Sequence, residues 1–279
     1  MFKMDSILNL KNLQQEADIW RLKEDMKIET AFEDAIHDEL FLLEDKSWWF
    51  KHRNKIIHTT IERYPPPIRR LLADVGGGNG FVSAYLNSYG IETILFEPGV
   101  QGVLNAKRRG LKNLLCAPLD KTTVMPNCLP AIGLFDVLEH MERESELLQE
   151  VQYALSPNGM LYVTVPAHNF LWSDEDDIAE HYRRYTKESL VTILSQNGFN
   201  VVFASYFFRM LSPAIFVLRS LPHKLGRKKK AVSEASGFVV PALVGKLADS
   251  FFDTEVKKIQ KGQAISHGAS IIAVARKDT

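Results

Sequence analysis

A glycine-rich turn with an acid on each side carries the clearest chemistry in this sequence. Residues 71–80 read Leu-Leu-Ala-Asp-Val-Gly-Gly-Gly-Asn-Gly, an apolar run that ends in an acid and then in closely spaced glycines. Glycine has no Cβ atom, so such a turn accepts positive φ angles and lets a ligand touch the backbone. Glu97 ends the next apolar run about 20 residues later, where nucleotide-binding folds place a ribose-binding carboxylate. The pattern predicts a nucleotide site.

The spacing of the glycines indicates which nucleotide. The dinucleotide fingerprint is Gly-x-Gly-x-x-Gly, but the residue three positions after Gly78 is Phe81. The pattern present, Asp-x-Gly-x-Gly-x-Gly, resembles the first motif of class I S-adenosylmethionine-dependent methyltransferases. That resemblance implies a cofactor site that comprises Asp74, Gly76, Gly77, Gly78, Gly80, Glu97 and Pro98. The alternative is that the glycines form a strand-to-helix turn and nothing more.

A second group of polar residues follows the fourth predicted strand. The segment Phe135-Asp136-Val137-Leu138-Glu139-His140 should lie at the carboxyl end of that strand, where parallel sheets bind ligands. It resembles the post-strand motif of small-molecule methyltransferases, including those of ubiquinone biosynthesis. The resemblance implies that Phe135 and Asp136 lie beside the cofactor and that His140 is a general base for a hydroxyl.

Two other interpretations of this segment stay open. Asp136, Glu139 and His140 could form an oxygen-rich metal site, or His140 could simply fix the loop. The base or orienting role is the one we carry forward, with no metal assigned.

A long polar and aromatic insert, residues 166–186, follows the fifth predicted strand and should lie over the binding crevice as a lid. Its sequence resembles a bacterial subgroup of class I methyltransferases, similar to the type 11 and type 12 groups. The resemblance implies a catalytic role for His181 and contacts of Trp172, Tyr182 and Arg184 with the acceptor or the cofactor. The alternative is an internal ion network between the arginines and the acidic run 174–177.

Two further residues are candidates for cofactor binding. Arg53 follows three adjacent aromatic residues, 48–50, and could reach the methionine carboxylate, although a salt bridge is the alternative. The aromatic residues cover a cleft or ligand, or they only dock the segment. Asp120 follows the third predicted strand, where an acid commonly binds the adenine amino group in the family. Its alternative is an ordinary loop acid.

Alternating apolar runs and helical stretches predict an α/β fold. We expect a Rossmann-like, doubly wound sheet with strands that begin near residues 71, 91, 113, 131, 160, 199 and 270. It should be mostly parallel, with the last strand antiparallel as the resemblance implies. Residues 1–64 are expected to form a helical cap, and residues 65–279 the methyltransferase domain, with a helical insertion at 207–266.

The composition is that of an ordinary soluble globular protein, with 46% hydrophobic and 24% charged residues among 279. Lysine plus arginine and aspartate plus glutamate number 34 each, so the zero net charge argues against a nucleic-acid substrate. Two cysteines without metal or redox spacing, and no signal-peptide or membrane-span pattern, favour a cytoplasmic protein.

The segment 207–230 is apolar and ends in the basic run Arg227-Lys228-Lys229-Lys230. Peripheral contact with anionic lipid, a homodimer face and a cover for the acceptor pocket are the alternatives for it.

The expected function is methyl transfer from S-adenosylmethionine, with S-adenosylhomocysteine as product, to a small-molecule or a lipid- or glycan-linked acceptor. Oxygen is the favoured accepting atom because a candidate base is present. One alternative is a module of the same fold that binds the cofactor without transfer. The other, a nicotinamide-dependent oxidoreductase, is disfavoured by the glycine spacing. The sequence does not identify the acceptor.

Overall fold

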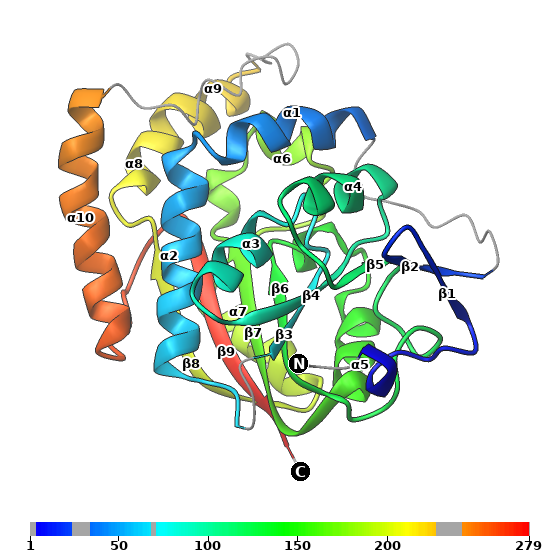
Figure 1. Ribbon diagram of the computed structural model, residues 1–279. Helices are drawn as coiled ribbons and strands as arrows, with labels where there is room; N and C mark the ends of the chain where they lie inside the picture. The colour runs from blue at the N-terminus through cyan, green and yellow to red at the C-terminus, as the bar shows by residue number, and fades with distance from the viewer. Residues whose placement is uncertain (1–3, 24–33, 68–70, 227–241, 279) are drawn as a thin grey trace.

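A nine-stranded sheet runs through the centre of the molecule (Figure 1). The computed structural model describes residues 4–23, 34–67, 71–226 and 242–278. The strands lie side by side in the order β1-β2-β5-β4-β3-β6-β7-β9-β8. Their bounds are Leu13–Glu16 (β1), Ile19–Leu22 (β2), Leu71–Val75 (β3), Glu92–Phe96 (β4), Leu114–Cys116 (β5), Leu129–Phe135 (β6), Leu155–Pro166 (β7), Phe199–Phe207 (β8) and Ser270–Lys277 (β9).

Strands β3 to β9 are the ones that the sequence predicts. β3 pairs in parallel with β4 and β6, β4 with β5, and β6 with β7. The last strand, β9, is antiparallel to both β7 and β8. The predicted α/β fold with an antiparallel last strand is therefore confirmed. Because the strand order reverses at β3, the crevice at the carboxyl ends of β3, β4 and β6 is where such sheets bind ligands.

β1 and β2 form a hairpin that the sequence prediction missed. They pair antiparallel with each other, and β2 extends the sheet by pairing in parallel with β5. Of the hairpin residues, Leu13 and Ile19 are buried, whereas residues 14–16 are exposed. A polar edge strand lacks the apolar run that marks a strand in a sequence. The prediction of a helical cap is therefore wrong for the hairpin.

Helices cover both faces of the sheet, and in Figure 1 α2 and α3 lie in front of it, with α10 at the left beside α2. On that face, Leu72 and Ile272 of the sheet share a core with Ile57 and Leu86. On the opposite face, Val163 packs in a core to which α5 and α7 contribute. The helices are Asp34–Glu44 (α1), Trp48–Arg63 (α2), Phe81–Ser88 (α3), Val100–Arg108 (α4), Glu144–Ala154 (α5), Asp174–Ile178 (α6), Lys187–Gln196 (α7), Leu211–Ile215 (α8), Leu221–Lys224 (α9) and Ala242–Gln260 (α10).

Aromatic residues fix α2 against the chain that follows β8. The ring of Trp48 stacks on Phe252 with centroids 5.3 Å apart, and Trp49 stacks on Phe208 at 3.8 Å. These two tryptophans therefore dock the segment, which is the second of the interpretations given above.

The predicted insertion at 207–266 contains α8, α9 and α10. A π-helical turn, Phe216–Ser220, joins α8 to α9. Residues 227–241 of the insertion, including the basic run, lie outside the described part of the chain.

Candidate active site

The glycine turn after β3 has the geometry that its sequence predicts. Gly76, Gly78 and Gly80 have φ angles of +66°, +52° and +71°, which L-residues rarely adopt. The Gly76 N–H donates to the Phe96 carbonyl at 2.8 Å and ties the turn to β4. A Cβ atom on Gly78 would meet no atom within 4 Å. The backbone of the turn is therefore open to a ligand at Gly78.

Glu97 lies at the end of β4 and faces this turn. Its Oε2 accepts a hydrogen bond from the Gly78 N–H at 2.8 Å, and its Oε1 accepts one from the Gly99 N–H at 2.7 Å. Burial raises the pKa of Glu97, and the two amides and His37 act in the opposite direction. Each carboxylate oxygen has two lone pairs, so Glu97 keeps acceptor capacity for ribose hydroxyls.

Asp74 lies beneath the turn. Its Oδ2 accepts a hydrogen bond from the Ser83 hydroxyl at 2.7 Å, and a Cβ on Gly77 would lie 3.0 Å from that same oxygen. Its Oδ1 is buried and has no hydrogen-bond partner in the described ranges. Burial raises the pKa of Asp74 to about 6. Asp74 therefore supports the turn from below, with one oxygen left unused.

Arg53 and Asp136 form an ion pair at the carboxyl end of β6. Arg53 Nη1 lies 2.5 Å from Asp136 Oδ2, and Thr164 Oγ1 donates to Asp136 Oδ1 at 3.0 Å. Asp136 has a φ of +59°, an unusual value of the kind that clusters at functional sites. Arg53 Nε is buried without a hydrogen-bond partner in the described part of the chain. The salt-bridge interpretation of Arg53 thus holds, and its free N–H is compatible with an anionic ligand group.

The surroundings of the other three predicted cofactor residues give less indication of a bound ligand. Asp120 Oδ1 accepts hydrogen bonds from Thr122 and Thr123 of its own loop, so this oxygen closes a local turn. The Phe135 ring is buried in the core and packs over Gly133. The Pro98 carbonyl faces the Cys116 sulfur at 3.7 Å. Ligand contacts of these three residues stay predictions.

Helix α1 lies against α4 and covers the glycine turn, which the sequence analysis did not anticipate. The His37 carbonyl accepts a hydrogen bond from Asn79 Nδ2 at 2.9 Å. The buried His37 ring packs on the α4 side of the turn, where its Nε2 would lie 3.2 Å from a Cβ on Gly99. The helical apolar spacing around residues 28–40 indicates a helix in the sequence, but the partner of that helix depends on tertiary packing.

The lid, residues 166–186, is closed at its base and attached to the segment after β6. The His168 N–H donates to the Tyr185 carbonyl at 2.7 Å, and the Tyr185 N–H donates to the Pro166 carbonyl at 3.0 Å. The Tyr182 N–H donates to the Glu139 carbonyl at 2.8 Å. These bonds tie the segment to the carboxyl ends of β6 and β7, and its role as a lid stays a prediction.

Asp176 organises the interior of the lid. It caps α6 by accepting a hydrogen bond from the Ser173 N–H at 2.9 Å, and it accepts one from His181 Nδ1 at 2.9 Å. Arg184 contacts both of its oxygens, at 2.7 and 2.9 Å. Burial acts to raise the pKa of Asp176, but the hydrogen bonds and charges of His181 and Arg184 outweigh it and lower the pKa to about 2. Sequence analysis placed Asp176 only in an acidic run.

The ion-network interpretation of the lid is correct for Arg184 but wrong for Arg183, which does not pair with the acidic run. Arg184 pairs with Asp176, and Arg183 pairs with Glu144 of α5. Trp172 Nε1 donates to Asp177 Oδ1 at 2.8 Å, and the Tyr182 side chain is exposed. Contacts of Trp172, Tyr182 and Arg184 with an acceptor stay predictions.

His181 of the lid lies against His140 of the segment after β6, with the rings edge to face and centroids 4.7 Å apart. A carboxylate only accepts hydrogen bonds, so Asp176 fixes the proton of His181 on Nδ1 and leaves a lone pair on Nε2. Burial, with the neighbouring His181, lowers the pKa of His140 to about 4. His140 is therefore neutral and a weak base near pH 7, whereas His181 is the better oriented of the two.

Glu139 completes a set of donors that could also hold a metal ion. Its ligand oxygen and one nitrogen each of His140 and His181 lie within 4.8 Å of one another. Glu139 is buried, and burial together with Asp136 raises its pKa well above the usual range. Asp136, which the sequence-based metal hypothesis included, is bound instead to Arg53 and Thr164.

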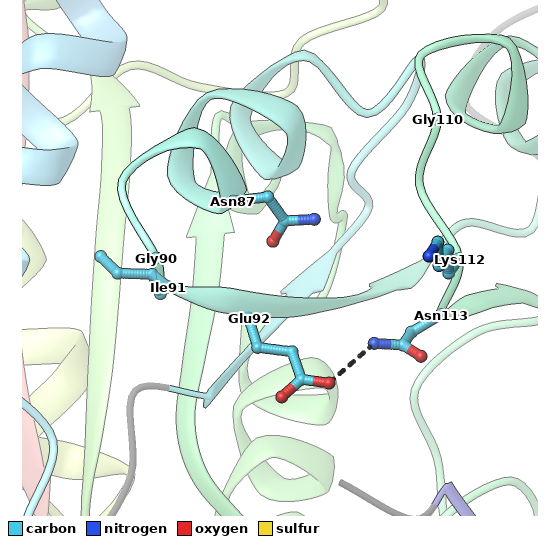
Figure 2. Close-up of a pocket in the computed structure, with 7 residues that line it drawn as sticks. All are labelled: Asn87, Gly90, Ile91, Glu92, Gly110, Lys112 and Asn113. Atoms are coloured by element: carbon cyan, nitrogen blue, oxygen red, sulfur yellow. Dashed lines mark hydrogen bonds between the residues drawn. The ribbon is translucent and has the colours of Figure 1, made fainter. Parts of the chain in front are cut away.

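A hollow of about 330 Å³ lies at the opposite edge of the sheet (Figure 2). Its lining includes Asn87, Glu92 and Asn113, at the amino end of β4. Because ligands of parallel sheets bind at carboxyl ends, we assign it no role in the site.

The strand order, the glycine turn and the acid after β4 together define a nucleotide-binding α/β protein of the methyltransferase type. A family model described as a methyltransferase domain matches residues 49–203, more than half of the chain. The chain belongs to this family and is an S-adenosylmethionine-dependent methyltransferase. A search of curated proteins gave no match.

Solved structures with low sequence identity share the fold. One is a chain in the complex between the Haloferax volcanii Trm112 methyltransferase activator and a candidate methyltransferase. It has 13% identity and a TM-score of 0.56, and the match covers 88% of this chain and 96% of that one. Another is phosphoethanolamine N-methyltransferase 2 of Haemonchus contortus with bound S-adenosylmethionine, at 14% identity and a TM-score of 0.55. That match covers 90% of this chain and 58% of the other.

Within the described ranges, no helix has the length and apolar character that crossing a bilayer requires.

Proposed function

We propose that this chain methylates an oxygen of a small-molecule, lipid-linked or glycan-linked acceptor, with His181 as the general base. The observation that carries the proposal is the Asp176–His181 pair inside the lid, with the His181 ring against His140 of the segment after β6. A hydroxyl must lose its proton to attack a methyl group, and a histidine held in one tautomer by a carboxylate is suited to accept that proton.

The residues around the glycine turn fit the cofactor. Glu97 would accept hydrogen bonds from the ribose hydroxyls, and the open backbone at Gly78 leaves room beside it. Arg53 Nε, which is buried and has no partner in the described part of the protein, would donate to the methionine carboxylate. When bound, the cofactor supplies an already activated methyl group on a sulfonium.

The remaining task of this chain is to align the acceptor and to remove its proton. Gly76 connects the two parts of the site, because a Cβ on it would lie 3.0 Å from Val137 in the segment that leads to Glu139 and His140. His140 lies against His181 and would remain neutral, so it would orient the acceptor or His181 without competing for the proton. The lid would exclude water from the transfer.

The experiment that tests this function measures the transfer of isotopically labelled methyl groups from S-adenosylmethionine to extracts of small molecules and lipids. Label in an alkali-stable product in which mass spectrometry places the methyl group on oxygen would support the proposal. A product labelled at nitrogen or carbon would contradict the assignment of oxygen. Cofactor binding without transfer to any fraction would favour the rival, a binding module of the same fold.

A further inference from the structure

The segment after β8 presents an apolar face to solvent. Backbone angles at Ile215, Phe216, Ser220 and Leu221 are all right-handed helical, so α8, the π-helical turn and α9 form one continuous helical segment, residues 211–224. The large apolar side chains exposed on and just after it are Val217 (57%), Leu218 (68%), Leu221 (39%) and Leu225 (68%). Their spacing places them on one side of a helix. We call these four residues the outer face.

The polar residues of this segment point the other way. Arg219 Nε lies 3.4 Å from Glu175 Oε1, and His223 Nδ1 lies 2.7 Å from Asp174 Oδ1, both on lid helix α6. The Arg219 and His223 side chains are only 16% and 20% exposed. A surface helix of a soluble protein normally buries its apolar stripe and exposes its polar side. This segment packs Ile215 and Phe216 against the core and still exposes four large apolar side chains on its other side, which marks the outer face as an interaction surface.

The charges around the outer face indicate its partner. No acidic residue occurs between Glu188 and Glu234 in the sequence, whereas Lys224 and the basic run 227–230 follow the outer face directly. The carboxylates near the segment, Asp174 and Glu175, are paired with His223 and Arg219. Exposed apolar side chains that are followed in the sequence by a basic run match the chemistry of an anionic phospholipid surface.

The outer face is also connected to the lid. Phe216, on the inner side of the segment, contacts Phe170 of the lid with ring centroids 6.1 Å apart. Together with the Arg219–Glu175 pair, this contact fixes the outer face beside the lid, which carries His181. A lipid surface at the outer face would therefore lie next to the lid.

We propose that Val217, Leu218, Leu221 and Leu225 insert into the interface of an anionic membrane and hold the lid side of the enzyme against it. This inference adds a docking surface to the proposed function. Membrane binding is measured without turnover, so a failure of either proposal is recognised separately.

The test is co-sedimentation of the full chain with vesicles of phosphatidylcholine, with and without phosphatidylglycerol. The protein is expected to bind the anionic vesicles at least tenfold more tightly than the neutral ones, and less tightly as salt increases. The double variant Leu218→Ser, Leu225→Ser should lose at least tenfold in affinity. The matched control, Met125→Ser with Val202→Ser, changes two exposed apolar residues elsewhere and should bind as the wild type does.

Three results would overturn the proposal: no binding to either vesicle, equal binding to both, or an unchanged affinity of the double variant. Sedimentation velocity without vesicles tests the other occupant, a second copy of the chain. A dimer that the double variant dissociates would assign the outer face to that copy instead.

Discussion

The proposed cofactor half and the proposed acceptor half of the site are built in different ways. Around the cofactor, backbone groups dominate: the turn at 76–80 takes its shape from glycine, and Glu97 is held by two main-chain amides. Around the acceptor, side chains dominate, because His181 and Arg184 are both held by Asp176. A site made from backbone groups can be recognised in the sequence from the spacing of its glycines. A site made from side chains depends on which residues the lid brings together.

The comparison predicts that removing His181, the proposed general base in the lid, has the largest effect on turnover. His181→Ala should lower kcat by about 10²- to 10⁴-fold, the usual contribution of a general base. Cofactor affinity should change little, because His181 belongs to the acceptor half. Rates of labelled methyl transfer and calorimetric titration of the cofactor measure the two quantities. His223→Ala is the control, since it removes another histidine that bonds α6, and it should keep turnover within a few-fold.

A chelator separates a general base from a metal ligand at this site. If a chelator abolishes wild-type turnover and an added divalent ion restores it, Glu139, His140 and His181 hold a cation and the base assignment is wrong.

On the cofactor side, removing one carboxylate should weaken binding without a comparable loss of fold. Glu97→Ala is expected to cost about 1.5–3 kcal/mol of binding free energy, the range for hydrogen bonds to a charged group. Calorimetric titration with S-adenosylhomocysteine measures it. Glu92→Ala, at the other end of β4, is the control and should bind normally. An unchanged affinity of Glu97→Ala would remove this residue from the site.

Two buried carboxylates, Asp74 and Asp176, should make stability depend on pH with opposite signs, and Asp74 has the larger effect. Burial raises its pKa to about 6, so the folded state binds more protons than the unfolded state between about pH 4 and pH 6. The ligand-free protein should therefore lose about 3 kcal/mol of stability as pH rises through that range. Denaturant unfolding at several pH values should show the loss, and Asp74→Asn should remove the part that Asp74 contributes, while Glu97 and Glu139, whose pKa values burial also raises, keep theirs. An identical pH slope in the variant would contradict this.

Asp176 should give a smaller effect of the opposite sign. Its pKa of about 2 lies below the unfolded value, so it contributes about 2 kcal/mol of stability above about pH 4, which is lost as pH falls toward 2. In Asp176→Asn this acid-dependent part of the stability should be missing. Unfolding curves of both proteins between pH 2 and pH 5 measure the difference, and parallel curves would show that the lid does not depend on this carboxylate.

Sequence reasoning succeeded where structure is local. The buried strands β3, β4 and β6 are apolar runs that end in an acid or glycine, so both the fold and the glycine turn were predictable. Trp49 and Arg184 were harder, because each had two interpretations that only tertiary contacts separate. The hairpin at 13–22 was missed because most of its residues are polar or only half-buried.

Two features of the site could not be predicted from one sequence. Helix α1 covers the glycine turn through His37 and Asn79, which are 42 positions apart in the chain. Asp176 differs from its neighbours in the acidic run only because the folded lid buries it against His181. In both cases the feature arises from packing between segments, so the sequence shows no local pattern for it.

The measurement that tests the central claim most directly is calorimetric titration of the purified protein with S-adenosylmethionine, S-adenosylhomocysteine and NADH. Micromolar binding of the first two, with no binding of NADH, is the result expected from the turn at 76–80 and the carboxylate of Glu97. Binding of NADH alone would contradict the account and revive the oxidoreductase interpretation.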